Sequence, residues 1–220
     1  MALEWDRREA FRYLGLRGAE PDAATARAVE EAAGALEAAI EPRQVSRRFL
    51  LRWDGGAMDI EGLRIESRAL AGNLAGCREV FLMAATLGMG PDTLIARAQA
   101  AGSMHRAVAL QAVAAAMIEA WCDEVNAGLR RQAEARGKAL RPRFSPGYGD
   151  FSLAAQEGIF RLLGAQRNIG ITLTDSLLML PTKSVTAVIG IADAPTDCPA
   201  GCAACDRTDC AFRDERRENR

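Results

Sequence analysis

The chain has 220 residues, of which 49% are hydrophobic, enough to bury the core of one medium or two small globular domains. Its 28 lysines and arginines nearly balance 29 aspartates and glutamates, so bulk charge gives no reason to expect nucleic acid or an anionic membrane as partner. Aromatic residues make up only 5%, which argues against a base-stacking platform.

The start of the chain carries charged residues where a secretory signal has its apolar segment, so we expect a cytoplasmic protein. The longest uncharged run of the first half covers residues 80–91. A spanning helix needs about 20 apolar residues, so this run predicts core and no membrane association.

Four segments of the first half show local patterns. Residues 22–40 repeat apolar positions at helical spacing and predict a long helix. Residues 47–53 predict a strand that ends at an Asp-Gly-Gly turn, and residues 79–87 form an apolar run typical of a buried strand. Residues 65–74 are ambiguous between helix and strand.

The second half contains the clearest element, a long helix over residues 104–136 that ends at Gly137. Another helical stretch begins at Pro91, a further helix is expected over residues 151–163, and residues 183–192 predict a strand. Helices and strands do not alternate regularly. We therefore expect an α+β fold with an antiparallel or mixed sheet packed with helices.

The composition changes after Asp193, where cysteines and mixed charges replace apolar residues. We expect one α+β domain over residues 1–193 and a cysteine-rich appendage over residues 194–220.

The segment 141–150 combines residue types that suit ligand binding. Ser145, Pro146, Gly147 and Tyr148 predict a type II turn, and the glycine lets backbone approach a ligand closely. Arg143 can grip a carboxylate with two hydrogen bonds, and Tyr148 offers an amphipathic ring. Local physics alone favours the plainer interpretation, which is a connection between helices with solvated arginines.

Four motifs in order change this interpretation. Residues 143–148 read Arg-Phe-Ser-Pro-Gly-Tyr, and residues 159–163 end the following helix. Residues 170–176 then read Gly-Ile-Thr-Leu-Thr-Asp-Ser, and residues 179–185 contain Pro-Thr-Lys-Ser-Val. This order resembles the activation domain of cobalamin-dependent methionine synthase, with its Arg-x-x-Pro-Gly-Tyr, Gly-x-x-Leu-Thr-Glu-Ser and Pro-x-x-Ser-Val motifs. The resemblance covers about residues 40–192.

The resemblance implies a domain that binds S-adenosylmethionine and uses it to remethylate a cobalamin in the inactive cob(II) state. The resemblance also implies a flavodoxin-type or ferredoxin-type protein as the electron donor. Arg143 is implied to hold the methionine carboxylate, the backbone from Ser145 through Pro146 to Gly147 to contact the ligand, and Tyr148 to pack against it.

An acidic residue of the long helix contacts the ligand's ammonium group in that family. The sequence Glu-Ala-Trp-Cys-Asp over residues 119–123 is the best match, and it points to Glu119. The plainer alternative is that Glu119 belongs to the solvated face of an amphipathic helix.

The chain departs from the family pattern after the tyrosine, where Gly149, Asp150 and Phe151 replace a proline, an alanine and a cysteine. It contains no Asp-x-His-x-x-Gly motif that would ligate cobalt, so we expect a partner protein to hold the cobalamin. No glycine-rich loop follows an early strand, which disfavours a Rossmann-type methyltransferase.

Four cysteines of the appendage have the spacing of a metal or cluster site: Cys198, Cys202, Cys205 and Cys210. Zinc and an iron-sulfur cluster both fit this spacing, and a redox or disulfide role and no role at all are the alternatives. Cys77 and Cys122 lie in apolar or helical contexts and are expected in the core.

His105 is the only histidine, so histidine-based acid-base catalysis is almost excluded, and the residue is expected to be structural or to face solvent. The leading hypothesis is an S-adenosylmethionine-binding factor that reactivates the cobalamin of a partner methionine synthase or other corrinoid methyltransferase. The alternatives are a non-catalytic metal-binding adaptor and an iron-sulfur electron carrier for a corrinoid protein.

Overall fold

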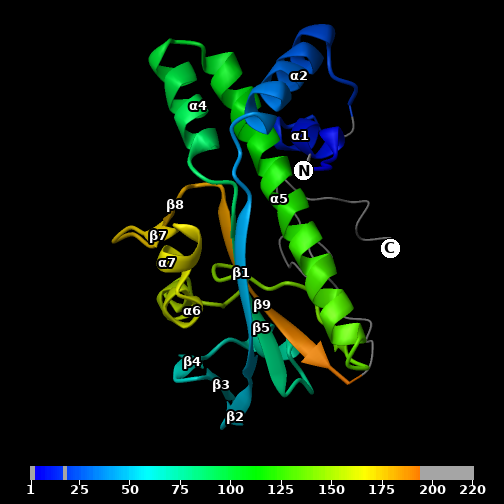
Figure 1. The fold of residues 1–220 in the computed structure, drawn as a ribbon, viewed down its shortest axis with the longest axis vertical. Coiled ribbons are helices and arrows are strands. Elements are labelled where there is room, and N and C mark those ends of the chain that lie inside the picture. Colours follow the sequence, from blue (N-terminus) through cyan, green and yellow to red (C-terminus); the bar gives the residue numbers. More distant parts are fainter. Residues whose placement is uncertain (1–2, 17–18, 194–220) are drawn as a thin grey trace.

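The computed structural model describes residues 3–16 and 19–193, which form helices and antiparallel sheets (Figure 1). The helices are α1 (Arg7–Tyr13), α2 (Ala23–Glu37), α3 (Arg68–Asn73), α4 (Gly90–Ala100), α5 (Met104–Glu134), α6 (Ala155–Leu163) and α7 (Ala165–Ile169). The strands are β1 (Arg43–Leu50), β2 (Arg52–Asp54), β3 (Ala57–Ile60), β4 (Leu63–Ile65), β5 (Glu79–Thr86), β6 (Ala139–Leu140), β7 (Thr172–Leu173), β8 (Met179–Leu180) and β9 (Ser184–Ala192). The predicted α+β class is confirmed.

The main sheet has the strand order β1-β5-β9-β6, and every neighbouring pair is antiparallel. β5 pairs along its full length with both neighbours, because Thr86 lies opposite Arg43 of β1 and Ser184 of β9. At the far edge, β6 covers only the last two residues of β9. Two smaller sheets, β2-β3-β4 and β7-β8, complete the strands.

The main sheet separates two hydrophobic cores, because successive side chains of a strand point to opposite faces. Phe81, Met83 and Ala85 of β5 pack toward α5 in the first core. Val80 and Leu82 pack toward α6, α7 and the β2-β3-β4 sheet in the second core. A strand with both faces covered is mostly apolar, which explains the apolar runs at residues 80–85 of β5 and 187–192 of β9.

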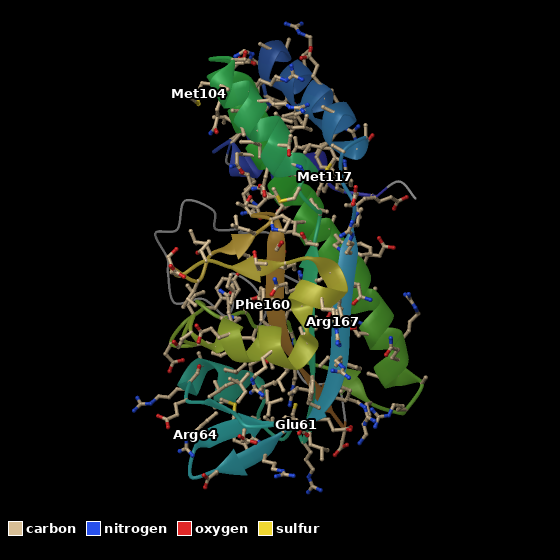
Figure 2. All side chains as sticks on the ribbon, turned by 60° about the vertical axis from the view of Figure 1, so that its left-hand side comes forward. Glu61, Arg64, Met104, Met117, Phe160 and Arg167 are labelled. Carbon is tan, nitrogen blue, oxygen red and sulfur yellow. The ribbon has the colours of Figure 1, made fainter. Side chains whose placement is uncertain are left out.

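Helix α5 is longer than the sheet that it covers. Its 31 residues span about 46 Å at 1.5 Å per residue, whereas the nine residues of β9 span about 30 Å. Figure 2 shows the end of α5 at Met104 extending beyond the sheet, and α1, α2 and α4 pack around this half of the helix. These helices bury the apolar positions of α5 that the sheet does not reach.

The predicted helices at residues 22–40 and 104–136 and the predicted strands at residues 79–87 and 183–192 are confirmed as α2, α5, β5 and β9. Asp22 caps α2, because its Oδ1 accepts a hydrogen bond from Thr25 N at 2.7 Å. Cys77 and Cys122 are 1% and 0% exposed, so the prediction that they belong to the core is confirmed. His105 is exposed on α5.

Three elements differ from the sequence-based expectation. The single strand predicted at residues 47–53 is in fact two strands, β1 and β2, divided at Leu51. The helix predicted from Phe151 begins only at Ala155, because the carbonyl of Phe151 accepts a hydrogen bond from Gly147 N and its ring is buried. The ambiguous residues 65–74 contain α3, and α1 had no predicted counterpart.

Among the described residues, no helix is long and apolar enough to cross a membrane. The four cysteines of the appendage, at positions 198, 202, 205 and 210, lie outside the described residues.

Gly190 of β9 tests the packing of the second core. A Cβ atom at this position would lie 2.8 Å from side-chain atoms of Arg141, Cys77 and Leu74. We expect Gly190→Ala to lower the free energy of unfolding by about 1–3 kcal/mol through overpacking, as measured by urea denaturation.

Gly34→Ala is the matched control, since Gly34 is exposed within α2 and a Cβ atom there meets nothing within 4 Å. This variant should raise the free energy of unfolding by about 0.5–1 kcal/mol. Equal effects of the two substitutions would contradict the packing of β9.

Candidate functional site

The loop that follows β6 runs along the open edge of β9. Arg141 N donates a hydrogen bond to Gly190 O at 2.9 Å, and Phe144 and Val188 exchange two backbone hydrogen bonds, each of 2.9 Å. Beyond this point, residues 184–187 of β9 have no strand partner on that edge among the described residues. The loop therefore lies beside an open sheet edge.

Residues 145–148 form the predicted turn. Tyr148 N donates a hydrogen bond to Ser145 O at 3.1 Å, and Gly147 has φ of +93°, which is the conformation that a type II turn requires at its third position. The side chain of Tyr148 stays 60% exposed, with its ring in an edge-on contact to Phe144 at 6.3 Å between centroids. The turn thus presents an accessible aromatic ring beside a glycine.

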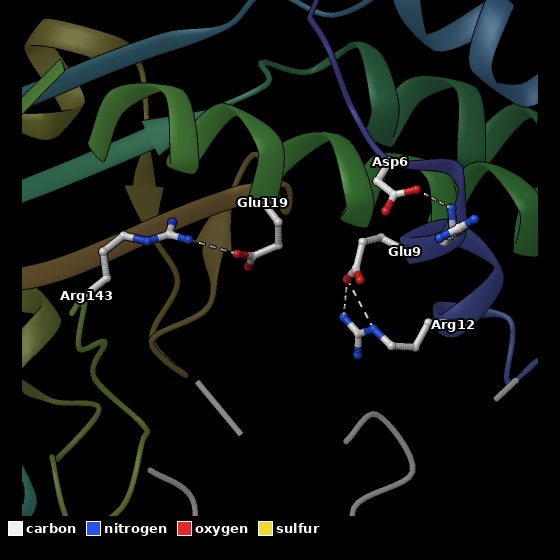
Figure 3. Close-up of polar contacts among 6 residues, drawn as sticks. Asp6, Glu9, Arg12, Glu119 and Arg143 are labelled. Carbon is white, nitrogen blue, oxygen red and sulfur yellow. Dashed lines mark hydrogen bonds and ion pairs between the residues drawn. The ribbon is translucent and has the colours of Figure 1, made fainter. Parts of the chain in front are cut away.

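Arg143 and Phe144 point to opposite sides of this segment. Phe144 packs with the second core, whereas Arg143 reaches α5. Nη2 of Arg143 donates to Oδ1 of Asp123 at 2.7 Å and to Oε2 of Glu119 at 3.3 Å; Figure 3 shows the contact with Glu119. The two acids lie one helical turn apart on α5, so they share one face of the helix.

Burial differs among the three charged side chains. Arg143 is 17% exposed, Glu119 is 39% exposed and Asp123 is 55% exposed. Burial by itself lowers the pKa of the Arg143 guanidinium, but the neighbouring Cys122, Glu119 and Asp123 outweigh it and raise the pKa above its ordinary value. Arg143 is consequently a permanent cation held in place by two carboxylates.

The neighbouring thiol of Cys122 lies beside the Arg143 guanidinium, but it is not a reactive group. Its side chain is buried, and burial raises the pKa of Cys122 to about 12. A thiol with so high a pKa stays protonated near neutrality, so it is a poor nucleophile and a poor metal ligand.

Helix α1 forms a second wall beside Glu119 (Figure 3). Nη2 of Arg12 pairs with Oε2 of Glu9 at 2.6 Å, and the Arg12 guanidinium lies 4.5 Å from the centre of the Tyr13 ring. Burial raises the pKa of Tyr13, and the charge of Glu119 raises it further. This wall was not predicted from the sequence, which shows no motif in α1.

A hollow of about 290 Å³ lies between α1, α4, α5 and the start of β9. Its lining includes Tyr13, Gln111, Ala115 and Lys183. Burial lowers the pKa of Lys183, and the charge of Asp92 opposes this shift. Ala115 lies one helical turn from Glu119, so the hollow and the charged cluster occupy neighbouring stretches of one face of α5.

Asp150 fastens the loop of Arg143 to helix α3. Its carboxylate accepts hydrogen bonds from Ser67 Oγ at 2.6 Å, Arg68 N at 2.7 Å and Ala69 N at 3.1 Å. These contacts lower the pKa of Asp150 to about 2, with the Ser67 hydroxyl as the largest cause. No sequence signal marks this contact, because its partners lie more than 80 residues away in the chain.

The residues of the site suit an α-amino-acid group. A guanidinium binds a carboxylate through parallel N–H donors, and an adjacent carboxylate binds an ammonium group. His105 lies 14 residues before Glu119 on α5, about 21 Å away along the helix axis, so acid-base catalysis by histidine has no support at this site.

The structure brings together the residues predicted for the site. Arg143, Ser145, Pro146, Gly147 and Tyr148 lie in one loop, and Glu119 contacts Arg143 directly. Their roles in ligand binding remain predictions. Asp123 had no predicted role, although its spacing of four residues from Glu119 places it on the same helical face.

The fold and the site place the chain among α+β domains that carry a charged cluster at the open edge of an antiparallel sheet. A family model of the vitamin B12-dependent methionine synthase activation domain matches residues 74–197, and the chain belongs to this family. The matched residues include α5, the loop of Arg143 and β9, so the predicted resemblance is confirmed.

A solved structure of the MetH reactivation domain bound to AdoHcy has the same fold. Its TM-score is 0.63 at 19% sequence identity, with 82% of this chain and 70% of that chain covered. No curated protein matches the chain at a significant level.

The low pKa of Asp150 predicts how the folding stability of the protein changes at acidic pH. Because the pKa in the folded chain lies below the ordinary value of 3.8, the ionised form favours folding above that value, and the contribution is lost as the pH falls toward about 2. We expect Asp150→Asn to unfold more easily than the wild type near neutrality, and the difference should shrink between pH 3.8 and pH 2 in circular dichroism melts.

Glu31→Gln removes an exposed carboxylate of α2 and is the control, with no change expected. A difference between Asp150→Asn and wild type that stays constant down to pH 2 would mean that the carboxylate charge does not matter.

Proposed function

We propose that the chain binds S-adenosylmethionine at the loop of Arg143 and supports the reductive remethylation of a cobalamin held by a partner methionine synthase or other corrinoid methyltransferase. The observation that carries this proposal is the pairing of Arg143 with Glu119 beside the Pro146-Gly147 turn. Family membership and the AdoHcy bound to the similar MetH domain support it.

The residues of the site fit the amino-acid end of S-adenosylmethionine. Arg143 would hold the carboxylate, and Glu119 would accept hydrogen bonds from the ammonium group. The turn can approach the ligand closely, because Gly147 has no side chain and has φ of +93°, a conformation that favours glycine. The exposed ring of Tyr148 would cover an apolar part of the ligand.

When bound, S-adenosylmethionine supplies an electrophilic methyl group to the cobalt of the partner, once a flavodoxin-type or ferredoxin-type donor has supplied one electron. The contribution of this chain is then orientation. Arg143 is held by two carboxylates of α5, and its loop is bound to β9 and α3, so the site is ordered before the ligand arrives. A fixed site can supply much of the rate through proximity alone.

A binding measurement tests the proposal. We expect Arg143→Ala to weaken S-adenosylmethionine binding by about 10-fold to 150-fold in isothermal titration calorimetry, since hydrogen bonds to a charged group are lost. Arg130→Ala removes an exposed arginine of α5 and should leave the affinity unchanged. Equal affinities of Arg143→Ala and wild type would count against this site.

We also propose that residues 194–220 form an appendage that binds a metal through Cys198, Cys202, Cys205 and Cys210. The support is the spacing of the cysteines alone, which suits zinc or an iron-sulfur cluster. If the amino-acid site proved unable to bind its ligand, this appendage would favour the alternative of a metal-binding adaptor or an iron-sulfur electron carrier for a corrinoid protein.

Anaerobically purified full-length chain should therefore contain metal by elemental analysis, and a Cys202→Ser, Cys205→Ser double variant should lose it. Visible absorption separates the two metals, since a zinc site is colourless. Asp206→Asn alters the same segment without removing a thiol and should retain the metal. A metal-free wild-type chain that takes up neither zinc nor iron would contradict the proposal.

A further inference from the structure

Asp123 and Glu119 of α5 both accept hydrogen bonds from Arg143. We propose that, in the free protein, Asp123 occupies the position on Arg143 that a ligand carboxylate would take. A ligand that carries both a carboxylate and an ammonium group displaces Asp123 from Arg143. The inference rests on the proposed function of the site, and it adds a residue that sets affinity and specificity.

Arg143 does not form a side-on pair, with two parallel hydrogen bonds, to either carboxylate of α5. The contacts of Arg143 with the two acids both use the single nitrogen Nη2, at 2.7 Å to Asp123 and 3.3 Å to Glu119. Neither acid forms the side-on pair in which two parallel N–H groups bind two carboxylate oxygens. A free ligand carboxylate is not tethered to α5 and can adopt this stronger arrangement.

Exposure indicates which acid gives way. Asp123 is 55% exposed and Glu119 is 39% exposed, so water can solvate the released Asp123 carboxylate at smaller cost. Arg143 is only 17% exposed, and a buried charge without a counter-charge is strongly unfavourable. Exchange of one carboxylate for another keeps Arg143 neutralised throughout binding.

Glu119 makes the exchange selective. A ligand that carries only a carboxylate would bring a third negative charge to one guanidinium, next to Glu119 and Asp123. An α-amino acid avoids this repulsion, because its ammonium group lies next to its carboxylate and can pair with Glu119. A nucleoside without an amino-acid end, such as 5′-methylthioadenosine, gains nothing from the release of Asp123.

The test measures AdoHcy affinity by calorimetry on the full chain. We expect Asp123→Asn to bind AdoHcy about two-fold to five-fold more tightly than the wild type, because an exposed ion pair no longer competes for Arg143. Asp123→Ser is a second variant with the same expectation. Glu124→Gln makes the same change of charge at the adjacent exposed position and should leave the affinity unchanged.

Two further readouts distinguish competition from a merely structural role. Asp123→Asn should lower the melting temperature of the ligand-free protein and raise its affinity for AdoHcy. If Asp123 were only structural, the substitution would lower both the melting temperature and the affinity. The affinity for 5′-methylthioadenosine should not respond to Asp123→Asn.

The outcomes separate the two proposals. If the wild type binds AdoHcy and both Asp123 variants bind it equally well or more weakly, the inference is overturned and the proposed function stands. Binding by the variants alone supports the inference, since Asp123 then blocks Arg143 fully. Absence of AdoHcy binding in the wild type and in both variants overturns the inference and the proposed function together.

Discussion

Backbone pairing along β9 is the interaction on which both the sheet and the site depend. One edge of β9 pairs with β5 from Ser184 to Ile191, and the other edge holds β6 and the loop of Arg143. Because Phe144 exchanges two hydrogen bonds with Val188, the position of Arg143 is set by the register of the sheet. A slip of one residue would turn Arg143 away from α5 and leave a cation in the apolar core.

Helix α5 supplies the acidic residues of the site, because one half of it packs against other helices and the other half packs along the sheet. Its first half is buried by α1, α2 and α4, and its second half lies along the sheet near the open edge of β9. Glu119 and Asp123 lie where the helix passes the loop of Arg143. Two carboxylates around one mostly buried guanidinium satisfy its charge, yet they leave it able to exchange one partner.

The departure from the family pattern after Tyr148 is accommodated by contacts within the fold. Asp150 caps the N-terminus of α3, Phe151 is buried in the second core, and Gly149 has φ of +54° with its Cβ position 3.0 Å from Ala69. These contacts bind the end of the loop to a helix that comes some 80 residues earlier in the chain. The loop is consequently held at both ends, at β9 and at α3.

The sequence by itself determined the parts of the protein that depend on local pattern. The periodicity of α5, the apolar runs of β5 and β9, and the Pro146-Gly147 turn follow from the residues of each segment. The ordered motifs also identified the family and pointed to Arg143 and Glu119. Only the tertiary structure decided that Asp123 shares Arg143, that Asp150 binds α3, and that α1 lines the site. These contacts join segments distant in the chain, and their energy depends on burial and distance, which no local pattern records.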